Sequence, residues 1–289
     1  MKTTGFFISH DFPIKYKKHG EPVYIIPFGD IHWGAPLCHK DKFNEFLAWA
    51  KKKERCYFLG MGDYFDISST SERAVFSNRA FHDSTKKSLE HVYKSMADEF
   101  SAKVGFMKGR LIGLLEGNHY SELSSGITTT QYICEKLNCK YLGVSAFISL
   151  HFHAPSKCRY KKKVIEVVAH HGLGGGRTSG SSVNKLEHMA ADAEADIFLM
   201  GHDHKKSIVM DSKRRKIYFQ EDRSVVVPRK TILCRTGSFL QGYVSGEPSY
   251  IADSALPPTD LGVVKIEITP QRRTIGKLRE IVLDIHASS

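Results

Sequence analysis

The sequence lacks any apolar run close to the ~18 residues that a membrane-spanning helix requires. Its first twenty residues contain only one short apolar patch, at 5–8, which is too short for the core of a signal peptide. The six cysteines include no Cys-x-x-Cys pair and have no spacing typical of a disulfide framework. These absences argue against a membrane-spanning or disulfide-stabilised protein, and they predict a reduced, cytoplasmic setting.

Internal repeats and low-complexity linkers are also missing, so the 289 residues are expected to form one domain, 1–289. With 41% hydrophobic and 25% charged residues, the chain can bury a sizeable core, and disorder is not indicated. The formal net charge of +11 favours a polyanionic partner such as DNA or RNA.

Apolar periodicity predicts alternating helices and strands in the first two thirds of the chain. A hairpin is expected over 141–169 around a basic loop at 156–163, and the remaining third contains short strands separated by turns. Together these patterns predict a mixed α/β architecture. The other expected elements are helices over 43–50, 89–100 and 182–193, and buried strands over 57–61, 111–115 and 196–200.

Five of the predicted buried strands lead directly into residues that could bind a metal ion. Alternate residues of an extended segment point to the same side, so Asp30 and His32 are expected to project together after the first strand. Side chains at the carboxyl ends of neighbouring strands converge at one edge of a sheet. The candidate ligands are Asp30, His32, Asp63, Asn118, His119, His170 or His171, His202 and His204.

This set contains carboxylates, an amide oxygen and several imidazoles, but no thiolate, which disfavours a structural cysteine-type zinc site. It is larger than one tetrahedral ion could use, whereas two ions that share a bridging carboxylate would account for it. The ligand types suit manganese, iron, zinc and nickel alike. We predict two divalent ions, with manganese as the first choice.

The ordered motifs resemble those of the calcineurin-like metallophosphoesterase family, and they run from residue 30 to 204. The motifs are Asp30-x-His32, Gly62-Asp63-x-x-Asp66, Gly117-Asn118-His119, His170-His171-Gly172 and Gly201-His202-x-His204. The resemblance implies a sandwich of two mixed β-sheets flanked by α-helices, which residues 205–289 would complete. It also implies two-metal hydrolysis of phosphomonoesters or phosphodiesters.

The resemblance also implies a role for each of these residues. Asp63 would bridge the two ions, and His119 would contact the phosphoryl group and assist the leaving oxygen without binding metal. The first ion would be held by Asp30, His32 and His204, and the second by Asn118, His170 and His202.

Two positions need separate treatment. Many family members have a carboxylate after Gly-Asn-His that orients the catalytic imidazole, whereas this chain has Tyr120, so Asp66 is one candidate for that task. Of the paired histidines, we predict His170 as the ligand and His171 as a neighbour of the phosphoryl site. A simple His-Gly motif would instead select His171.

The glycine-rich stretch 172–180 lacks the Gly-Lys-Ser/Thr ending of a nucleotide P-loop. It follows a ligand-bearing strand, so Arg177 is a candidate substrate contact, as are Lys205 and Lys206 directly after the last ligand. We predict a nuclease or phosphodiesterase acting on nucleic acid. The alternatives are a small-molecule phosphodiesterase or nucleotide phosphatase, and a non-catalytic metal-binding nucleic-acid module.

Overall fold

A computed structural model of the chain describes residues 8–66, 82–154, 162–220, 223–275 and 278–289. Its strands form two sheets, and each sheet contains both parallel and antiparallel pairs. The loop of the predicted hairpin lies largely outside the described residues, but its two strands are present and antiparallel.

The six-stranded sheet has the order β1-β5-β6-β7-β9-β8, and the five-stranded sheet has the order β11-β10-β2-β3-β4. The first sheet consists of β1 (His10–Lys15), β5 (Ser145–His153), β6 (Lys162–His170), β7 (Ile197–Met200), β9 (Arg223–Thr236) and β8 (Lys206–Gln220). The second consists of β11 (Leu278–Ser288), β10 (Lys265–Ile275), β2 (Val23–Phe28), β3 (Cys56–Gly60) and β4 (Leu111–Leu114).

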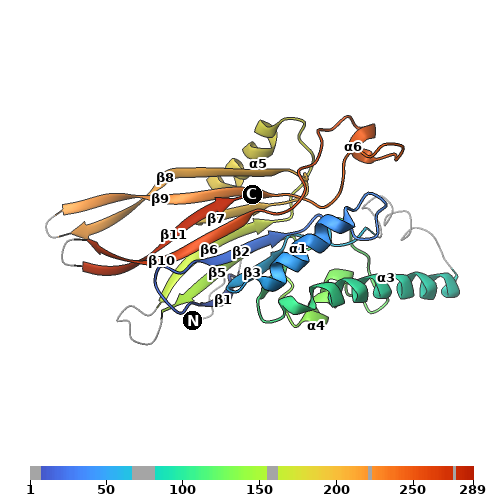
Figure 1. The fold of residues 1–289 in the computed structure, drawn as a ribbon, viewed down its shortest axis with the longest axis horizontal. Helices are drawn as coiled ribbons and strands as arrows, with labels where there is room; N and C mark the ends of the chain where they lie inside the picture. The colour runs from blue at the N-terminus through green and yellow to red at the C-terminus, as the bar shows by residue number, and fades with distance from the viewer. Residues whose placement is uncertain (1–7, 67–81, 155–161, 221–222, 276–277) are drawn as a thin grey trace.

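Helices cover the outer faces of both sheets (Figure 1). Phe43 of α1 and Phe100 of α3 share a buried cluster with Phe28 and Phe58 of the five-stranded sheet, and Leu186 of α5 packs on the six-stranded sheet. The helices are α1 (Lys40–Lys52), α3 (Asp83–Val104), α4 (Thr129–Leu137), α5 (Ser179–Asp192) and α6 (Tyr250–Asp253), with a 3-10 turn at Gly105–Met107.

The main core lies between the two sheets, and it explains why β2 is apolar throughout. Ile25 points into the inter-sheet cluster, whereas its neighbour Ile26 joins the cluster under α1 and α3. A strand that is buried on both faces reads as a continuous apolar run. The four layers confirm the α/β sandwich of two mixed sheets flanked by helices that the motifs implied.

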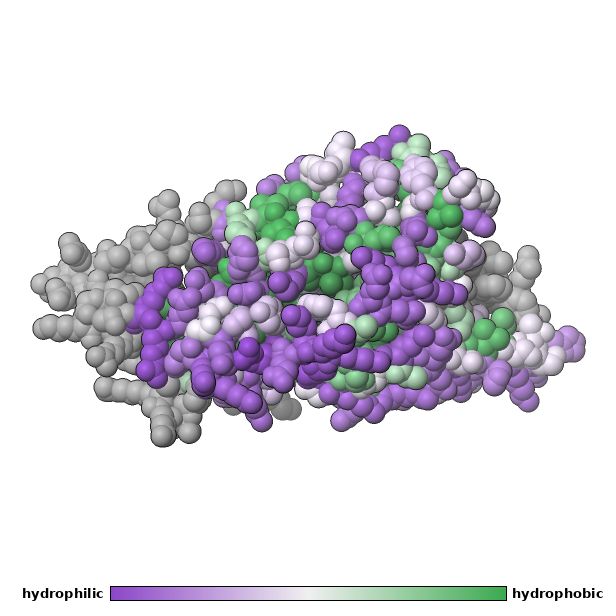
Figure 2. Space-filling view, in the orientation of Figure 1, coloured by the Kyte–Doolittle hydropathy of each residue, from purple (hydrophilic) through white to green (hydrophobic). Residues whose placement is uncertain are grey.

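Of the C-terminal strands, β8 and β9 belong to the six-stranded sheet, and β10 and β11 belong to the five-stranded sheet. All four extend past the part that the helices cover (Figure 1). Figure 2 shows a mostly hydrophilic surface over α1 and α3, with hydrophobic groups only in separate small areas of this face. Among the described helices, none combines the length and the hydropathy needed to cross a membrane. No disulfide joins the five described cysteines.

Candidate metal centre

The candidate ligands lie where strands of both sheets end at a common edge. Strands β2, β3 and β4 are mutually parallel, as are β6, β7 and β9, so the carboxyl ends within each set coincide. The loops after β2 and β3 are also joined by backbone hydrogen bonds, from Asp30 N to Gly62 O at 2.9 Å and from Ile31 N to Asp63 O at 2.8 Å. These backbone hydrogen bonds fix the positions of Asp30 and Asp63 relative to each other without the help of a bound ion.

The backbone at the site is held in an uncommon conformation. Positive φ angles occur at Asp30 (47°), His32 (50°), Asp63 (51°), His202 (72°) and His204 (56°), which are five of the eight such non-glycine residues described. Left-handed conformations cost free energy in residues other than glycine, and they persist where the surrounding structure over-determines them. The fold therefore imposes these conformations on residues that carry candidate ligands.

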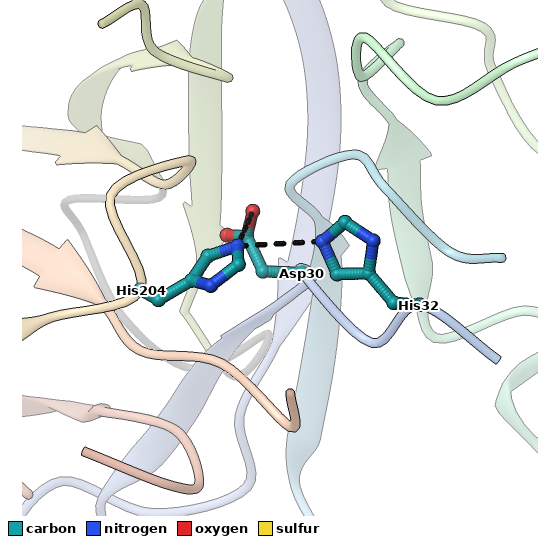
Figure 3. Close-up of side chains that lie close together, drawn as sticks. All are labelled: Asp30, His32 and His204. Atoms are coloured by element: carbon teal, nitrogen blue, oxygen red, sulfur yellow. Dashed lines mark hydrogen bonds and ion pairs between the residues drawn. The ribbon is translucent and has the colours of Figure 1, made fainter. Parts of the chain in front are cut away.

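The first group of candidate ligands is Asp30, His32 and His204 (Figure 3). The Nε2 atoms of His32 and His204 lie 3.3 Å apart, and Nε2 of His204 lies 3.6 Å from Oδ1 of Asp30. Burial, with smaller effects from neighbouring charges, lowers the pKa of His32 and holds the pKa of His204 well below its ordinary value. Both rings are thus neutral near pH 7 and can present a lone pair to a cation.

The second group is Asp63, His171 and His202, with Asn118 beside it. Nε2 of His171 lies 3.3 Å from Oδ2 of Asp63 and 3.0 Å from Oδ1 of Asn118. Nδ1 of His202 lies 2.9 Å from the same Asn118 oxygen. Burial and the neighbouring His171 lower the pKa of His202 to about 4.

The tautomer of His171 shows why this group suits a cation. Nδ1 of His171 lies 2.7 Å from the carbonyl oxygen of Met61, so it must donate its hydrogen there. In the neutral ring, Nε2 then carries a lone pair that faces the oxygens of Asp63 and Asn118. Such a convergence of acceptors needs a proton or a metal ion between them. Burial opposes protonation, but the carboxylate of Asp63 raises the pKa of His171 to about 9.

Asp63 connects the two groups. Its Oδ2 is 3.3 Å from Nε2 of His171 and 3.8 Å from Nε2 of His32, and the residue is only 3% exposed. Burial alone would raise the pKa of this carboxyl, yet the neighbouring imidazoles, His171 foremost, hold the pKa well below its usual range. The position is the one that a carboxylate shared by two ions would occupy.

The pKa of Asp30 is shifted in the opposite direction from that of Asp63. It is fully buried and accepts the backbone N–H of His202 at 2.9 Å. Burial, opposed in part by His171 and reinforced by the charge of Asp63, raises the pKa of Asp30 to about 7. Two buried carboxylates in one site are costly without cations, so bound metal ions would favour the ionised form of both.

His119 lies beside the first group and has a carboxylate partner of its own. Its Nδ1 is 2.7 Å from Oδ1 of Asp66, and its backbone N–H donates to Oδ1 of Asp63 at 2.9 Å. Burial lowers the pKa of His119, but the hydrogen bond to Asp66 and the charges of Asp63 and Asp66 outweigh that effect and raise it. The contact that we considered for Asp66 is therefore present.

The structure places His171, and not His170, in the second group. Val167 and Ala169 of β6 point into the core between the sheets, whereas Val168 points toward α5. By this alternation His170 falls on the α5 side, where its Nδ1 accepts the backbone N–H of Gly172 at 2.7 Å. His171 thus lies in the group where we had predicted His170, and this is the placement that a simple His-Gly motif would select.

This placement leads to a prediction for the two histidines. His171→Ala should weaken metal binding more than ~10-fold, because it removes a donor atom from the second group. His170→Ala should leave metal affinity within about twofold of the parent, and it serves as the control. Titration of the metal-free variants with Mn²⁺ measures both, and the reverse order would return the ligand role to His170.

The candidate substrate contacts already have partners inside the protein. Lys205 Nζ donates to the carbonyl oxygens of Gly176 and Thr178, and Lys206 Nζ forms an ion pair with Asp260 at 3.2 Å. Arg177 donates to the carbonyl oxygen of Ser254 at 3.4 Å. All three lie in or next to the loops that carry His171, His202 and His204.

Close packing against Asp63 also sets the identity of Gly117. A methyl group on this residue would overlap Oδ1 and the backbone nitrogen of Asp63. Gly117→Ala should therefore displace the shared carboxylate, lowering metal affinity at least ~10-fold and stability by about 1–3 kcal/mol. Gly105→Ala is the matched control, because Gly105 has helical φ and open space around it. Metal titration and thermal unfolding of both variants check this, and normal metal binding by Gly117→Ala would contradict it.

Sequence reasoning overlooked Arg235, Asp203 and Ser182, which form a buried network behind the His202–His204 loop. One signal was available, because Arg235 directly follows the buried apolar run Ile232–Cys234. A lone charge in such a run is seldom buried without a partner.

The comparisons with known proteins found likenesses only among solved structures. No protein-family model and no curated protein matches the sequence. Among solved structures, the chain is similar to a predicted phosphoesterase of Streptococcus pneumoniae, with 12% identity and a TM-score of 0.33 over 91% of this chain and 99% of that chain. It is also similar to wild-type Vps29 of Entamoeba histolytica in complex with zinc, with 10% identity and a TM-score of 0.39 over the same shares.

GAP50 of Plasmodium, an anchor in the inner membrane complex, is a third similar structure, with 12% identity and a TM-score of 0.34 over 93% of this chain and 88% of that chain. At such identities and scores, these likenesses carry no conclusion about activity. What this chain can do follows from its own side chains.

Proposed function

We propose that this protein is a metal-dependent phosphoester hydrolase with two divalent ions. One observation carries the proposal: two groups of ligand atoms meet at Asp63, and the His119–Asp66 pair lies directly beside them. A structural metal site needs ligands alone, whereas this arrangement adds an imidazole with a raised pKa at the same edge of the sheets.

The donor set fits two such ions. Asp30, His32 and His204 would hold the first, and Asn118, His171 and His202 would hold the second, with Asp63 shared. When bound, a pair of divalent ions lowers the pKa of water and neutralises phosphoryl oxygens. Neutral imidazoles and carboxylates suit manganese, iron, zinc and nickel alike. We take manganese as the first choice.

His119 then acts on the leaving group. Asp66 accepts the hydrogen of Nδ1 and fixes the ring orientation, which leaves Nε2 to face the substrate. Because its pKa is raised, His119 retains a proton that it can donate to the departing oxygen. The charge of Asp66 stabilises the imidazolium until that transfer takes place.

Within this class, we propose a phosphodiester of nucleic acid as the substrate. The net charge of +11 supports a polyanion. The internal partners of Lys205 and Lys206 favour the second candidate, a small phosphodiester or nucleotide, because these cations would have to leave their present contacts to bind a nucleic-acid backbone. A non-catalytic metal-binding module would have no use for the His119–Asp66 pair.

A substrate panel separates these candidates. Manganese-loaded protein would be incubated with bis(p-nitrophenyl) phosphate, a mononucleotide, a cyclic dinucleotide, single-stranded DNA and RNA, and duplex DNA. The proposal expects turnover of the chromogenic diester and faster cleavage of at least one nucleic acid. No turnover of any substrate above that of an Asp63→Asn preparation would refute the hydrolase, and cleavage of small diesters alone would refute the nuclease.

Salt dependence tests whether the two lysines contact the backbone of a nucleic acid. Binding that neutralises phosphates weakens with salt, with a log–log slope of about −0.7 to −0.9 per phosphate contacted. Lys205→Ala/Lys206→Ala should flatten that slope by roughly one to two units and leave turnover of the chromogenic diester nearly unchanged. An unchanged slope, measured by fluorescence anisotropy between low and moderate salt, would assign both lysines to their internal contacts alone.

A further inference from the structure

A buried arginine lies behind the candidate metal centre. Arg235 is the penultimate residue of β9 and is only 1% exposed. Removing a guanidinium from water is costly unless most of its donors find acceptors. The acceptors that pair with Arg235 therefore show which segments of the chain the buried side chain connects.

The guanidinium joins three segments of the chain. Its Nη1 donates to the carbonyl oxygen of Gly201 at 3.0 Å, at the start of the loop that carries His202 and His204. Its Nε and Nη2 donate to the carbonyl oxygen of Ser182, in the first turn of α5, at 3.1 and 2.8 Å. Strand β9, helix α5 and the His202–His204 loop are thus held at one point.

Asp203 completes the network from within the loop. Its Oδ2 lies 3.4 Å from Nε of Arg235 and accepts the hydroxyl of Ser182, and its Oδ1 accepts the backbone N–H of Lys205 at 3.4 Å. Asp203 stands between two candidate ligands, so its side chain ties their loop to Arg235 and Ser182 and holds the backbone that follows His204.

The anchored loop is also the one whose two histidines have left-handed backbone conformations, with φ of 72° at His202 and 56° at His204. Such conformations persist only where neighbouring contacts enforce them. The carbonyl that Arg235 holds precedes the N–H of His202, which donates to the carboxylate of Asp30 at 2.9 Å. Contacts from Arg235 thus continue into the first ligand group.

We propose that Arg235 is a positioning residue that sets the affinity of both metal ions through one loop. The proposal rests on the proposed function, because it takes His204 as a ligand of the first ion and His202 as a ligand of the second. Net stabilisation alone does not account for the network, since the desolvation of a buried ion pair offsets much of its attraction.

The test compares Arg235→Lys with Arg55→Lys. Lysine retains the charge but cannot donate to Gly201 and Ser182 together from a rigid planar fork. Arg55 pairs with Glu21 at 2.5 Å and precedes β3, at the opposite end of that strand from Asp63, so it controls for the substitution itself. Asp203→Asn is a second variant, which leaves the contacts of Arg235 to the two carbonyl oxygens in place.

Titration of each metal-free protein with Mn²⁺ gives the affinities, and the visible spectrum of the cobalt-loaded protein reports ligand geometry. We expect Arg235→Lys to weaken both ions about 10- to 100-fold and to alter the cobalt spectrum. Asp203→Asn should weaken both by a smaller factor, and Arg55→Lys should match the parent. A lower melting temperature with parental affinities and spectrum would overturn the proposal and leave only a structural role.

If Arg235→Lys does not fold, Asp203→Asn decides, and parental affinities in that variant overturn the proposal. Failure of the proposed function looks different. A parent that binds two ions but hydrolyses no phosphoester would refute the hydrolase and leave the positioning role intact.

Discussion

Replacing Asp63 by Asn is expected to abolish both metal binding and hydrolysis. The side chain lies between the two ligand groups, with Oδ2 within 3.3 Å of His171 and 3.8 Å of His32. Asparagine retains the size but loses the negative charge that two cations would share. Loss of a partner that only orients a ligand typically costs 10- to 100-fold in metal affinity, so loss of the shared ligand should exceed ~100-fold.

The measurement is metal content after dialysis against micromolar Mn²⁺, together with the rise in melting temperature that metal binding produces. The parent should retain metal and gain thermal stability, whereas Asp63→Asn should do neither. Asp196→Asn is the matched control, because Asp196 is also a buried aspartate but lies at the start of β7, away from the ligands. Near-parental metal content in Asp63→Asn would refute the shared-carboxylate assignment.

His119→Ala is expected to separate catalysis from metal binding. In the proposed function His119 donates a proton and does not ligate, so metal content should stay close to that of the parent. Loss of a positioned general acid lowers kcat by ~10²–10⁴. The loss should be smaller for nitrophenyl esters, because nitrophenolate leaves readily without protonation, and larger for alkyl or nucleoside leaving groups.

Two further variants sharpen this test. Asp66→Asn keeps His119 in place but removes the charge that raises its pKa, so it should lower kcat by a smaller factor and shift the alkaline limb of the pH–rate profile to lower pH. His151→Ala is the control, because His151 also pairs with an aspartate, Asp11 at 2.5 Å, in another part of the molecule. Loss of metal from His119→Ala would show that His119 is itself a ligand.

Several features of this site were predictable because they depend on local sequence. An apolar run followed by Gly29 and Asp30, or by Gly62 and Asp63, marks the end of a buried strand and the turn after it. Parallel strands align their carboxyl ends, so the convergence of those turns followed from the strand pattern. The mixed α/β architecture was predictable for the same reason.

The motif alone could not determine which of His170 and His171 faces the candidate metal centre. Adjacent residues at the end of a strand point to opposite faces, so a shift of one residue exchanges the site for the α5 side. Which face is which depends on how the six-stranded sheet packs against its neighbour, as the different surroundings of Val167 and Val168 show. No local pattern contains that information.

By itself, the sequence determined the types of the candidate donor atoms, their order along the chain and the strand ends that present them, since side-chain chemistry and periodicity are local properties. It did not determine which of the paired histidines faces Asp63. Only the tertiary structure decided that Asp66 contacts His119, that Asp63 lies between the two groups and that Arg235 holds the His202–His204 loop. These contacts join residues that are 31 to 108 positions apart in the sequence, so no local pattern predicts them. The tertiary environment also sets the histidine pKa values: burial and His171 lower the pKa of His202 to about 4, whereas Asp63 raises the pKa of His171 to about 9 against the effect of burial.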